Sequence, residues 1–246
     1  MVPRPLRRVY GAPVPRWALL LCLSSACASA VPALSGGSTT PKARTDLAVG
    51  GAARVPTGAL RDPEGVALHE AADAGGIVPV AVFRRGLSRR LDLGVMVAGA
   101  VGRLELRGEV GTREGSTRPT WVWAAAPYVG GIPDRDGSGR GVRFGLDAPF
   151  VRAIDFGGVY DLWVGPRVGL EGVRGRFRGA REDKSQGWQL SLRAGAVVGL
   201  AAGFRRVHAL IELTVAWEQQ WGELQGTDLG RGGLVLLPAF GLRVRI

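Results

Sequence analysis

Two histidines are the side chains of this chain best suited to acid-base chemistry, and His208 has the more suggestive neighbours. Glu212 and Glu218 share the polar face of the strand expected around His208, and Ser191 lies on the preceding expected strand. A histidine beside a carboxylate and a hydroxyl can act as a general base that activates a nucleophile. The same group can also be a structural hydrogen-bonded network, which is the role we expect. His69 falls in an expected loop, so we predict no catalytic residue.

The sequence gives little support for a metal site, a disulfide or a bound cofactor. Both cysteines, Cys22 and Cys27, fall within the first thirty residues, so the rest of the chain has no thiolate site and no disulfide. Asp134 and Asp136 precede Gly137 as at the start of a calcium loop, but no glutamate closes the pattern, which indicates a turn. No glycine-rich phosphate loop joins a strand to a helix. The sequence predicts no metal site and no cofactor.

Residues 1–30 have the three parts of a secretory signal: an arginine-bearing start, a short apolar run and small residues before a cleavage site. The motif Ala28-Ser29-Ala30 places cleavage after Ala30. A second interpretation is a lipoprotein signal, because the stretch ending at Cys27 is similar to a lipobox and Cys27 would then carry lipid. Either way the sequence predicts an exported protein. Residues 31–44 are small, polar and proline-bearing, which predicts a flexible linker.

The remainder, residues 45–246, repeats apolar side chains at every second position, the period of a β-strand. The stretch Gly233–Ile246 shows the pattern most clearly. One face is apolar, with Leu234, Leu236, Phe240, Leu242, Val244 and Ile246, and the other is small or charged at Ala239, Gly241, Arg243 and Arg245. Loops are expected at 134–141 and 174–186. About ten strands are expected, near residues 45–55, 77–84, 91–98, 104–110, 120–129, 142–150, 159–172, 188–198, 207–217 and 233–246.

The polar faces of these strands indicate which side is buried. They consist largely of glycine, alanine and serine interleaved with arginine and acidic residues, and downstream of the signal the only lysines are Lys42 and Lys184. Such a face suits a crowded, charge-paired interior better than a solvated exterior. The apolar faces are then left for lipid, and many strands are close to the 9–11 residues that cross a bilayer.

The C-terminal strand resembles the closing strand of bacterial outer-membrane β-barrels, which ends on an apolar residue after apolar residues at every second place. Ile246 stands where phenylalanine is commonest in that family. The segment Gly86–Gly94, a short basic turn that leads into an alternating strand, resembles the hairpin turns of the same barrels. The resemblance covers residues 45–246. It implies an all-β fold, an antiparallel up-and-down transmembrane barrel of about ten strands.

The same resemblance implies the outer membrane of a Gram-negative bacterium. Its expected partners are outer-membrane lipid, lipopolysaccharide wherever basic residues face outward, and the barrel assembly machinery, which would engage the C-terminal strand. A barrel of this size is largely filled by side chains, so we expect a structural or surface-interaction role and little conduction. The residues expected to pair their charges inside the lumen are Arg103, Glu105, Arg107, Glu109, Arg143, Asp147, Asp161, Arg167, Glu171, Arg193, His208, Glu212, Glu218, Arg243 and Arg245.

Two other functions remain open from the sequence. One is a lipoprotein anchored at Cys27, whose β-barrel is soluble in the periplasm and binds an apolar ligand. The other is a barrel enzyme that modifies lipid through His208, although Val207-His208-Ala209 lacks the His-x-Ser spacing of the outer-membrane deacylases. Nucleic acid is not expected, because no basic face on a soluble domain is evident; of the net charge of +11, four arginines belong to the first thirty residues, which leaves +7.

Overall fold

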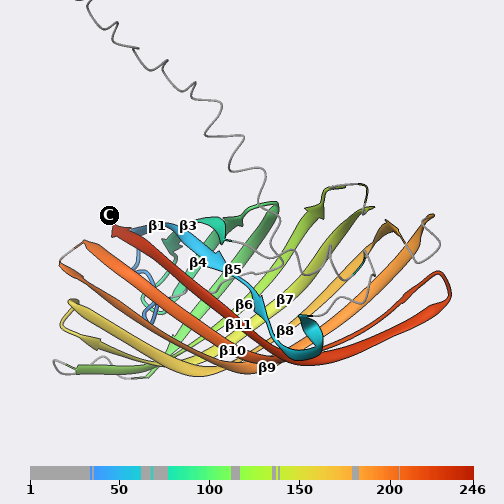
Figure 1. Cartoon of the computed structure of the whole chain (residues 1–246). Coiled ribbons are helices and arrows are strands. Elements are labelled where there is room, and N and C mark those ends of the chain that lie inside the picture. Colours follow the sequence, from blue (N-terminus) through green and yellow to red (C-terminus); the bar gives the residue numbers. More distant parts are fainter. Residues whose placement is uncertain are drawn as a thin grey trace, which may run out of the picture.

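A computed structural model of the chain describes residues 34, 36–61, 68, 77–111, 117–134, 137, 139–178, 183–204 and 206–246. In these residues ten antiparallel strands form one sheet whose first and last strands also pair with each other, so the sheet closes into a barrel (Figure 1). The prediction of an antiparallel up-and-down barrel of about ten strands is confirmed. The strands are β1 (Thr45–Ala53), β3 (Ile77–Gly86), β4 (Leu91–Ala98), β5 (Val101–Val110), β6 (Thr117–Ile132), β7 (Gly139–Phe156), β8 (Tyr160–Arg178), β9 (Lys184–Phe204), β10 (Val207–Leu224) and β11 (Thr227–Arg245).

The register of the strands fixes the width of the barrel. Partners followed from Gly50 of β1 through β3 and on around the sheet lead to Leu229 of β11, whereas Gly50 itself pairs with Gly241. The stagger from Leu229 to Gly241 is twelve residues, which for ten strands corresponds to a tilt of about 40° and a backbone radius of about 10 Å. A barrel this narrow is filled by its own side chains.

The closing seam lies between β1 and β11. Thr45 and Ile246 exchange backbone hydrogen bonds of 2.9 and 2.8 Å, and Asp46 lies opposite Arg245 and forms an ion pair with it at 3.0 Å. The short strand β2 (Val55–Pro56) continues the register of β1 along β11. The ladder breaks between β1 and β2 where Pro238 stands on β11, because proline has no N–H to donate.

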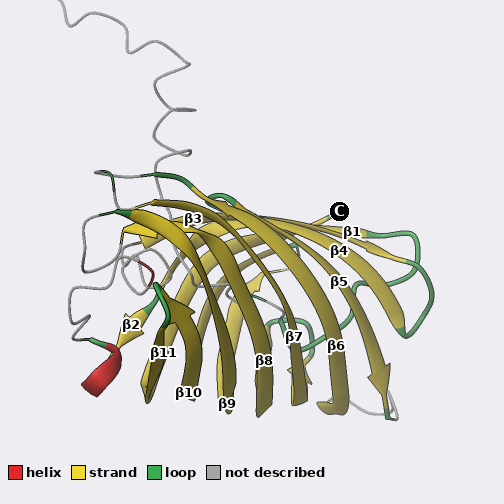
Figure 2. Cartoon of the chain, turned by 90° about the vertical axis from the view of Figure 1, so that its right-hand side faces the viewer, coloured by secondary structure: helices red, strands yellow, loops and turns green. Residues whose placement is uncertain are grey.

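The two ends of the barrel differ. We call the end at which Thr45 and Arg245 lie the terminal end, and the opposite one, with the β6–β7, β8–β9 and β10–β11 hairpins, the far end. Strands β1, β3, β4 and β5 have 8 to 10 residues, whereas β6 to β11 have 16 to 21. The longer strands therefore stand out at the far end, on the right of Figure 1, and Figure 2 shows them side by side in a curved wall.

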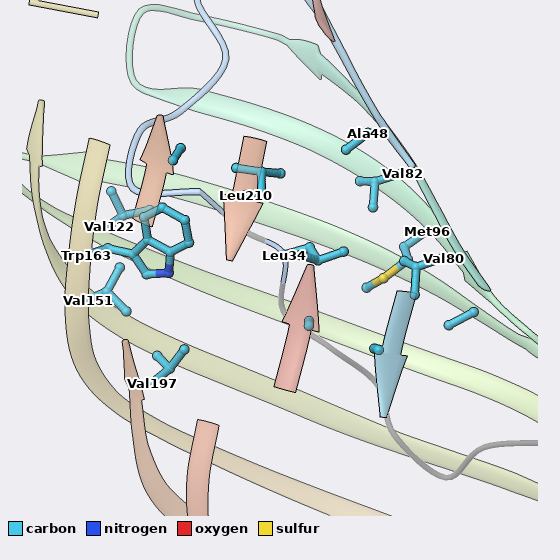
Figure 3. Packing of buried hydrophobic residues seen from close by; sticks show 14 of the residues in the cluster. Leu34, Ala48, Val80, Val82, Met96, Val122, Val151, Trp163, Val197 and Leu210 are labelled. Carbon is cyan, nitrogen blue, oxygen red and sulfur yellow. The ribbon is translucent and has the colours of Figure 1, made fainter. Parts of the chain in front are cut away.

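Alternation along each strand separates an inward row from an outward one. On β10 the inward residues His208, Leu210 and Glu212 are buried, while the outward residues Ile211 and Leu213 are exposed. The largest buried apolar cluster lies inside the barrel and includes Leu210 and residues of most strands (Figure 3). The core of this protein is therefore its lumen.

Two expected loops differ from the structure. The stretch 174–186 was predicted to be a charged loop, but β8 runs to Arg178 and β9 begins at Lys184. The stretch 134–141 was predicted to be a loop, but β7 begins at Gly139. In both stretches the strands continue past their apolar outward row, and polar side chains there face water without interrupting the backbone pairing. The loop predictions were wrong because they depended on outward apolar residues.

The predicted flexible linker at 31–44 also differs from the structure. Among its described residues, Leu34 and residues 36–41 lie inside the barrel at the terminal end, where Leu34, Thr39 and Thr40 are buried, whereas residues 42–44 are exposed. The composition was that of a tether, but these small residues fit where the facing walls carry hydrogen-bonding carboxylates. Among the described residues, no helix has both the length and the apolar character needed to cross a membrane.

Candidate functional site

The outer surface of the barrel is apolar. On β10 the outward residues Ile211, Leu213, Val215 and Trp217 are 65%, 37%, 40% and 53% exposed. On β8 the outward apolar row runs from Tyr160 to Leu170, and ten residues of a strand tilted by about 40° span about 25 Å, the height of the apolar band of membrane barrels. A soluble barrel would bury these rows. The polarity of its two faces makes the fold that of a transmembrane β-barrel.

The inner surface carries the charges. Of the fifteen residues predicted to face the lumen, fourteen are buried, and the side chain of Arg245 at the terminal end is 17% exposed. Asp46, Arg54, Arg84 and Asp92, which were not in the predicted set, are buried as well. Together these groups comprise nine arginines and nine carboxylates besides His208. The ionic groups inside the described part of the barrel therefore balance.

One path of ion pairs crosses the lumen at mid-height. Arg84 and Arg103 both contact Glu105, at 2.8 and 2.9 Å. Arg103 and Arg167 both contact Asp147, at 3.0 and 2.8 Å. Arg167 also donates to the hydroxyl of Thr214 at 2.8 Å. The path joins β3, β5, β7, β8 and β10, and most of its links pass over an intervening strand, so it spans the interior instead of following the wall.

A second path lies nearer the far end. Glu218 accepts from Arg54 at 3.0 Å and lies 3.8 Å from Arg193. Arg193 donates to the hydroxyl of Tyr128 at 3.0 Å, and Tyr128 donates to Glu171 at 2.9 Å. This path connects β6, β8, β9 and β10 with the short link between β1 and β2. Both paths keep charged groups paired inside the barrel, away from the apolar rows of the outer surface, which we call the apolar belt. An ion without a counter-charge would be costly there.

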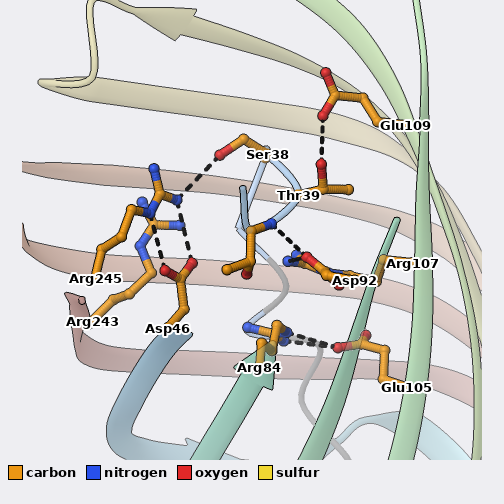
Figure 4. A network of polar contacts seen from close by, with 12 residues as sticks. Ser38, Thr39, Asp46, Arg84, Asp92, Glu105, Arg107, Glu109, Arg243 and Arg245 are labelled. Carbon is orange, nitrogen blue, oxygen red and sulfur yellow. Dashed lines mark hydrogen bonds and ion pairs between the residues drawn. The ribbon is translucent and has the colours of Figure 1, made fainter. Parts of the chain in front are cut away.

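The N-terminal segment of the described chain fills the terminal end of the lumen (Figure 4). The backbone N–H of Gly37 donates to Asp161 at 3.0 Å, and that of Thr40 donates to Asp92 at 2.6 Å. The Thr39 hydroxyl donates to Glu109 at 2.7 Å. The segment is thus held by carboxylates of three different strands, β8, β4 and β5.

Residues of the β2–β3 connection close in at the far end. Leu60, in the 3-10 turn Gly58–Leu60, is 1% exposed, and Leu68 is 0% exposed. Leu68 packs in a cluster with Ile132, Val173, Phe177 and Leu224, which are inward residues of β6, β8 and β10. Segments that precede or connect the barrel strands therefore enter the lumen from both ends.

The residues considered together with His208 lie apart in the structure. His208 donates from Nε2 to the carbonyl oxygen of Gly158 at 2.9 Å. Ser191 pairs with Gln220 of β10, twelve residues from His208, which is about 40 Å along a strand. Glu212 accepts instead from the Trp163 indole N–H and from the backbone N–H of Leu34. His69, Cys27 and Ala30 lie outside the described residues, and within those residues no group of three or more metal-ligating side chains is found.

Sequence reasoning missed several residues of this interior. Asp46 and Asp92 occupy alternate positions of β1 and β4 that face the lumen, so the alternation of the two strands could have included them. Arg54 falls in the break between β1 and β2, and Thr39 and Thr40 precede the first strand, so no alternation marks them. Tyr128 was not in the predicted set either, but it is buried and donates a hydrogen bond to Glu171.

Comparisons with known proteins identify no family for this chain. No protein-family model matches the chain, and no curated protein matches it. Among solved structures, Neisserial surface protein A is 11% identical, with 82% of this chain and 95% of that chain covered and a TM-score of 0.33. Ail of Yersinia pestis, an attachment invasion locus protein, is 11% identical over 83% and 99%, with a TM-score of 0.29. The monoaromatic hydrocarbon channel CymD is 9% identical over 83% and 89%, with a TM-score of 0.25. The assignment to membrane barrels rests on the polarity of the two faces.

Proposed function

We propose that the protein is an outer-membrane β-barrel of a Gram-negative bacterium with a filled lumen, serving as a structural or surface-interaction protein and not as a wide pore. The observation that carries the proposal is the path of ion pairs from Arg84 to Thr214 across the interior. Beside it, a cavity lined by Asp147 and Arg167 measures about 10 Å³, and one at the terminal end beside Thr39 about 100 Å³. Such spaces hold single waters or small clusters and no continuous column of hydrated ions.

The ends of the barrel support one orientation. Membrane barrels have short periplasmic turns and longer extracellular loops. Tight turns lie at both ends, at 157–159 on the terminal side and at 99–100 and 225–226 on the far side, but the long connection between β2 and β3 lies at the far end. On β8 a further eight residues, from Leu170 to Arg178, extend about 20 Å beyond the apolar row at the far end. We therefore assign the terminal end to the periplasm and the far end to the cell surface.

Export and assembly complete the proposal. Cleavage after Ala30 would leave three residues before Leu34, which is buried inside the barrel. A lipid on Cys27 would instead have to leave the lumen to reach the membrane, so we favour cleavage after Ala30. The outward row of β11, from Phe240 to Ile246, is apolar and exposed, and it remains our candidate for recognition by the barrel assembly machinery.

Two measurements on the unmodified protein test the proposal. A closed membrane barrel extracted in detergent should migrate differently on a gel before and after boiling, and in planar bilayers it should show no steps of a wide pore. Large conductance steps with a normal gel shift would contradict the filled lumen and leave the barrel intact. Absence of the gel shift, together with release from the membrane by Cys27→Ser, would instead support the periplasmic lipoprotein.

A further inference from the structure

An open groove of about 850 Å³ lies on the outer surface at the far end of the barrel. Three exposed arginines line it, Arg140 of β7 and Arg174 and Arg176 of β8. Their outward positions continue the apolar row of β8 beyond Leu170, so the groove begins where the apolar belt ends. We call it the outer basic groove.

Pairing across the strands concentrates positive charge in this groove. Arg140 lies directly opposite Arg176, and Arg174 lies opposite Val142 on one side and Trp188 on the other. Like charges directly opposite on a sheet destabilise the pair unless an anion lies between them. In the described part of the chain, the side chains of Arg174 and Arg176 have neither a hydrogen bond nor an ion pair. The groove is therefore arranged for an anion from outside the chain.

The carboxylate that lines the groove does not cancel this charge. Asp134 accepts from the Lys184 ammonium and from the backbone N–H of Gly139, at 3.0 Å from the latter. The hydrogen bond from Lys184 is the largest cause of a lowered pKa of Asp134, so this group is ionised and already engaged. The ionic groups of the described lumen balance among themselves, so the three arginines of the groove, which lie within two neighbouring strands, are not neutralised from inside.

The apolar side of the groove selects the kind of anion. Val142 and Pro133 line it, and the outward-facing Gly131, with nothing within 4 Å of a Cβ there, leaves it open on that side. Directly toward the belt lie the exposed Phe144 and Leu170. A ligand with phosphates at the arginines and acyl chains along Phe144 and Leu170 would use both parts of the surface, whereas a free phosphate would use only one. Arginine is well suited to phosphate because its planar group can donate two parallel hydrogen bonds.

We propose that the outer basic groove binds the phosphate-bearing head group of a lipid in the outer leaflet, such as a phosphorylated glycolipid. The proposal deepens the proposed function and rests on it, because it requires the far end to face the outer leaflet. It gives the protein a fixed lipid partner on one side of its circumference, along β6 to β9.

The test removes charge from the groove without touching the lumen. In Arg174→Gln/Arg176→Gln the loss of two charge-assisted contacts should reduce binding of purified lipopolysaccharide by at least about tenfold, measured by native mass spectrometry of the detergent-solubilised barrel. The matched control is Arg85→Gln/Arg152→Gln, which removes two exposed arginines on the outer surface away from the groove and should bind as the unmodified protein does. Dephosphorylated lipopolysaccharide should bind the unmodified protein as weakly as the groove variant binds the phosphorylated form.

The outcomes separate the possible failures. Equal lipid binding by the groove variant and the control variant would overturn the proposal. Equal displacement of lipid from these two variants by millimolar inorganic phosphate would also overturn it, because it would indicate a site for free anions. The heat-dependent gel shift of each variant shows whether its barrel is closed. A normal shift with no loss of lipid contradicts only the groove, whereas absence of the shift in the unmodified protein contradicts the membrane barrel itself.

Discussion

Leu34 donates its backbone N–H to Oε1 of Glu212 at 3.0 Å, across 178 residues of sequence. The other oxygen of the same carboxylate accepts from the Trp163 indole at 3.3 Å. One side chain of β10 thus holds both the N-terminal segment and a fully buried aromatic residue of β8. Because Leu34 also belongs to the apolar cluster inside the barrel, the segment is fixed by packing as well as by polar contacts (Figure 3).

The first prediction concerns the packing of the N-terminal segment against the wall of the barrel. A Cβ on Gly37 would lie 2.3 Å from Asp161 Oδ1 and 3.0 Å from the Cβ of Ala153, so Gly37→Val should push the segment away from the wall. We expect the free energy of unfolding to fall by about 1–3 kcal/mol while the gel shift persists, since the strands themselves are unchanged. Gly230→Val on β11 is the control, because nothing lies within 4 Å of a Cβ there. Equal unfolding midpoints in urea for the two variants would show that the contacts of the segment with Asp161 and Ala153 do not stabilise the barrel.

The second prediction concerns the ion pairs at mid-height. Asp147→Ala removes the carboxylate that both Arg103 and Arg167 contact, in a buried site, and should lower the free energy of unfolding by about 3–5 kcal/mol. Urea unfolding of the barrel in detergent measures the change. The control Asp134→Ala removes a carboxylate from an exposed pair with Lys184 and should change stability little. Similar stability of both variants would mean that the central path adds little to the fold.

The sequence was sufficient for the strands and for the inward direction of most charged residues, because both follow from a period of two. Arg103 and Glu105 alternate with Leu104 and Leu106, and parity alone places the first pair on one face. Parity does not say which charges meet. Arg103 contacts Asp147 across β6, and this requires the stagger of the strands, which no local pattern encodes.

Two features were missed from the sequence. Residues 36–41 have no periodic pattern, and their place inside the barrel depends on carboxylates supplied by β4, β5 and β8. Beyond Leu170 the alternate positions of β8 carry Gly172 and then arginines, so the end of the apolar row was mistaken for the end of the strand. Inward Val173 and Phe177 continue the period there and were the available signal.

The third prediction concerns the close contact of an aromatic ring with the backbone. Trp163 pairs with Gly199 on β9, and a Cβ at Gly199 would lie 2.1 Å from atoms of the indole ring. Gly199→Ala should therefore displace Trp163 and lower the free energy of unfolding by about 1–3 kcal/mol, the usual range for overpacking. Gly131→Ala is the matched control, because nothing lies within 4 Å of its Cβ. Equal unfolding midpoints in urea for these two variants would show that the ring is free to move.

The fourth prediction tests the apolar belt directly. Leu213 faces outward near the middle of β10, where the neighbouring outward residues Ile211 and Val215 are apolar and exposed. An arginine at the midplane of the lipid face costs about 2–4 kcal/mol, so Leu213→Arg should reduce the fraction of protein that shows the gel shift in the membrane fraction. Glu223→Arg places the same side chain on the same strand beyond the belt, where water solvates it, and should insert normally. If Leu213→Arg inserts as well as Glu223→Arg does, this face of β10 does not meet lipid, and the apolar rows would need a protein partner instead.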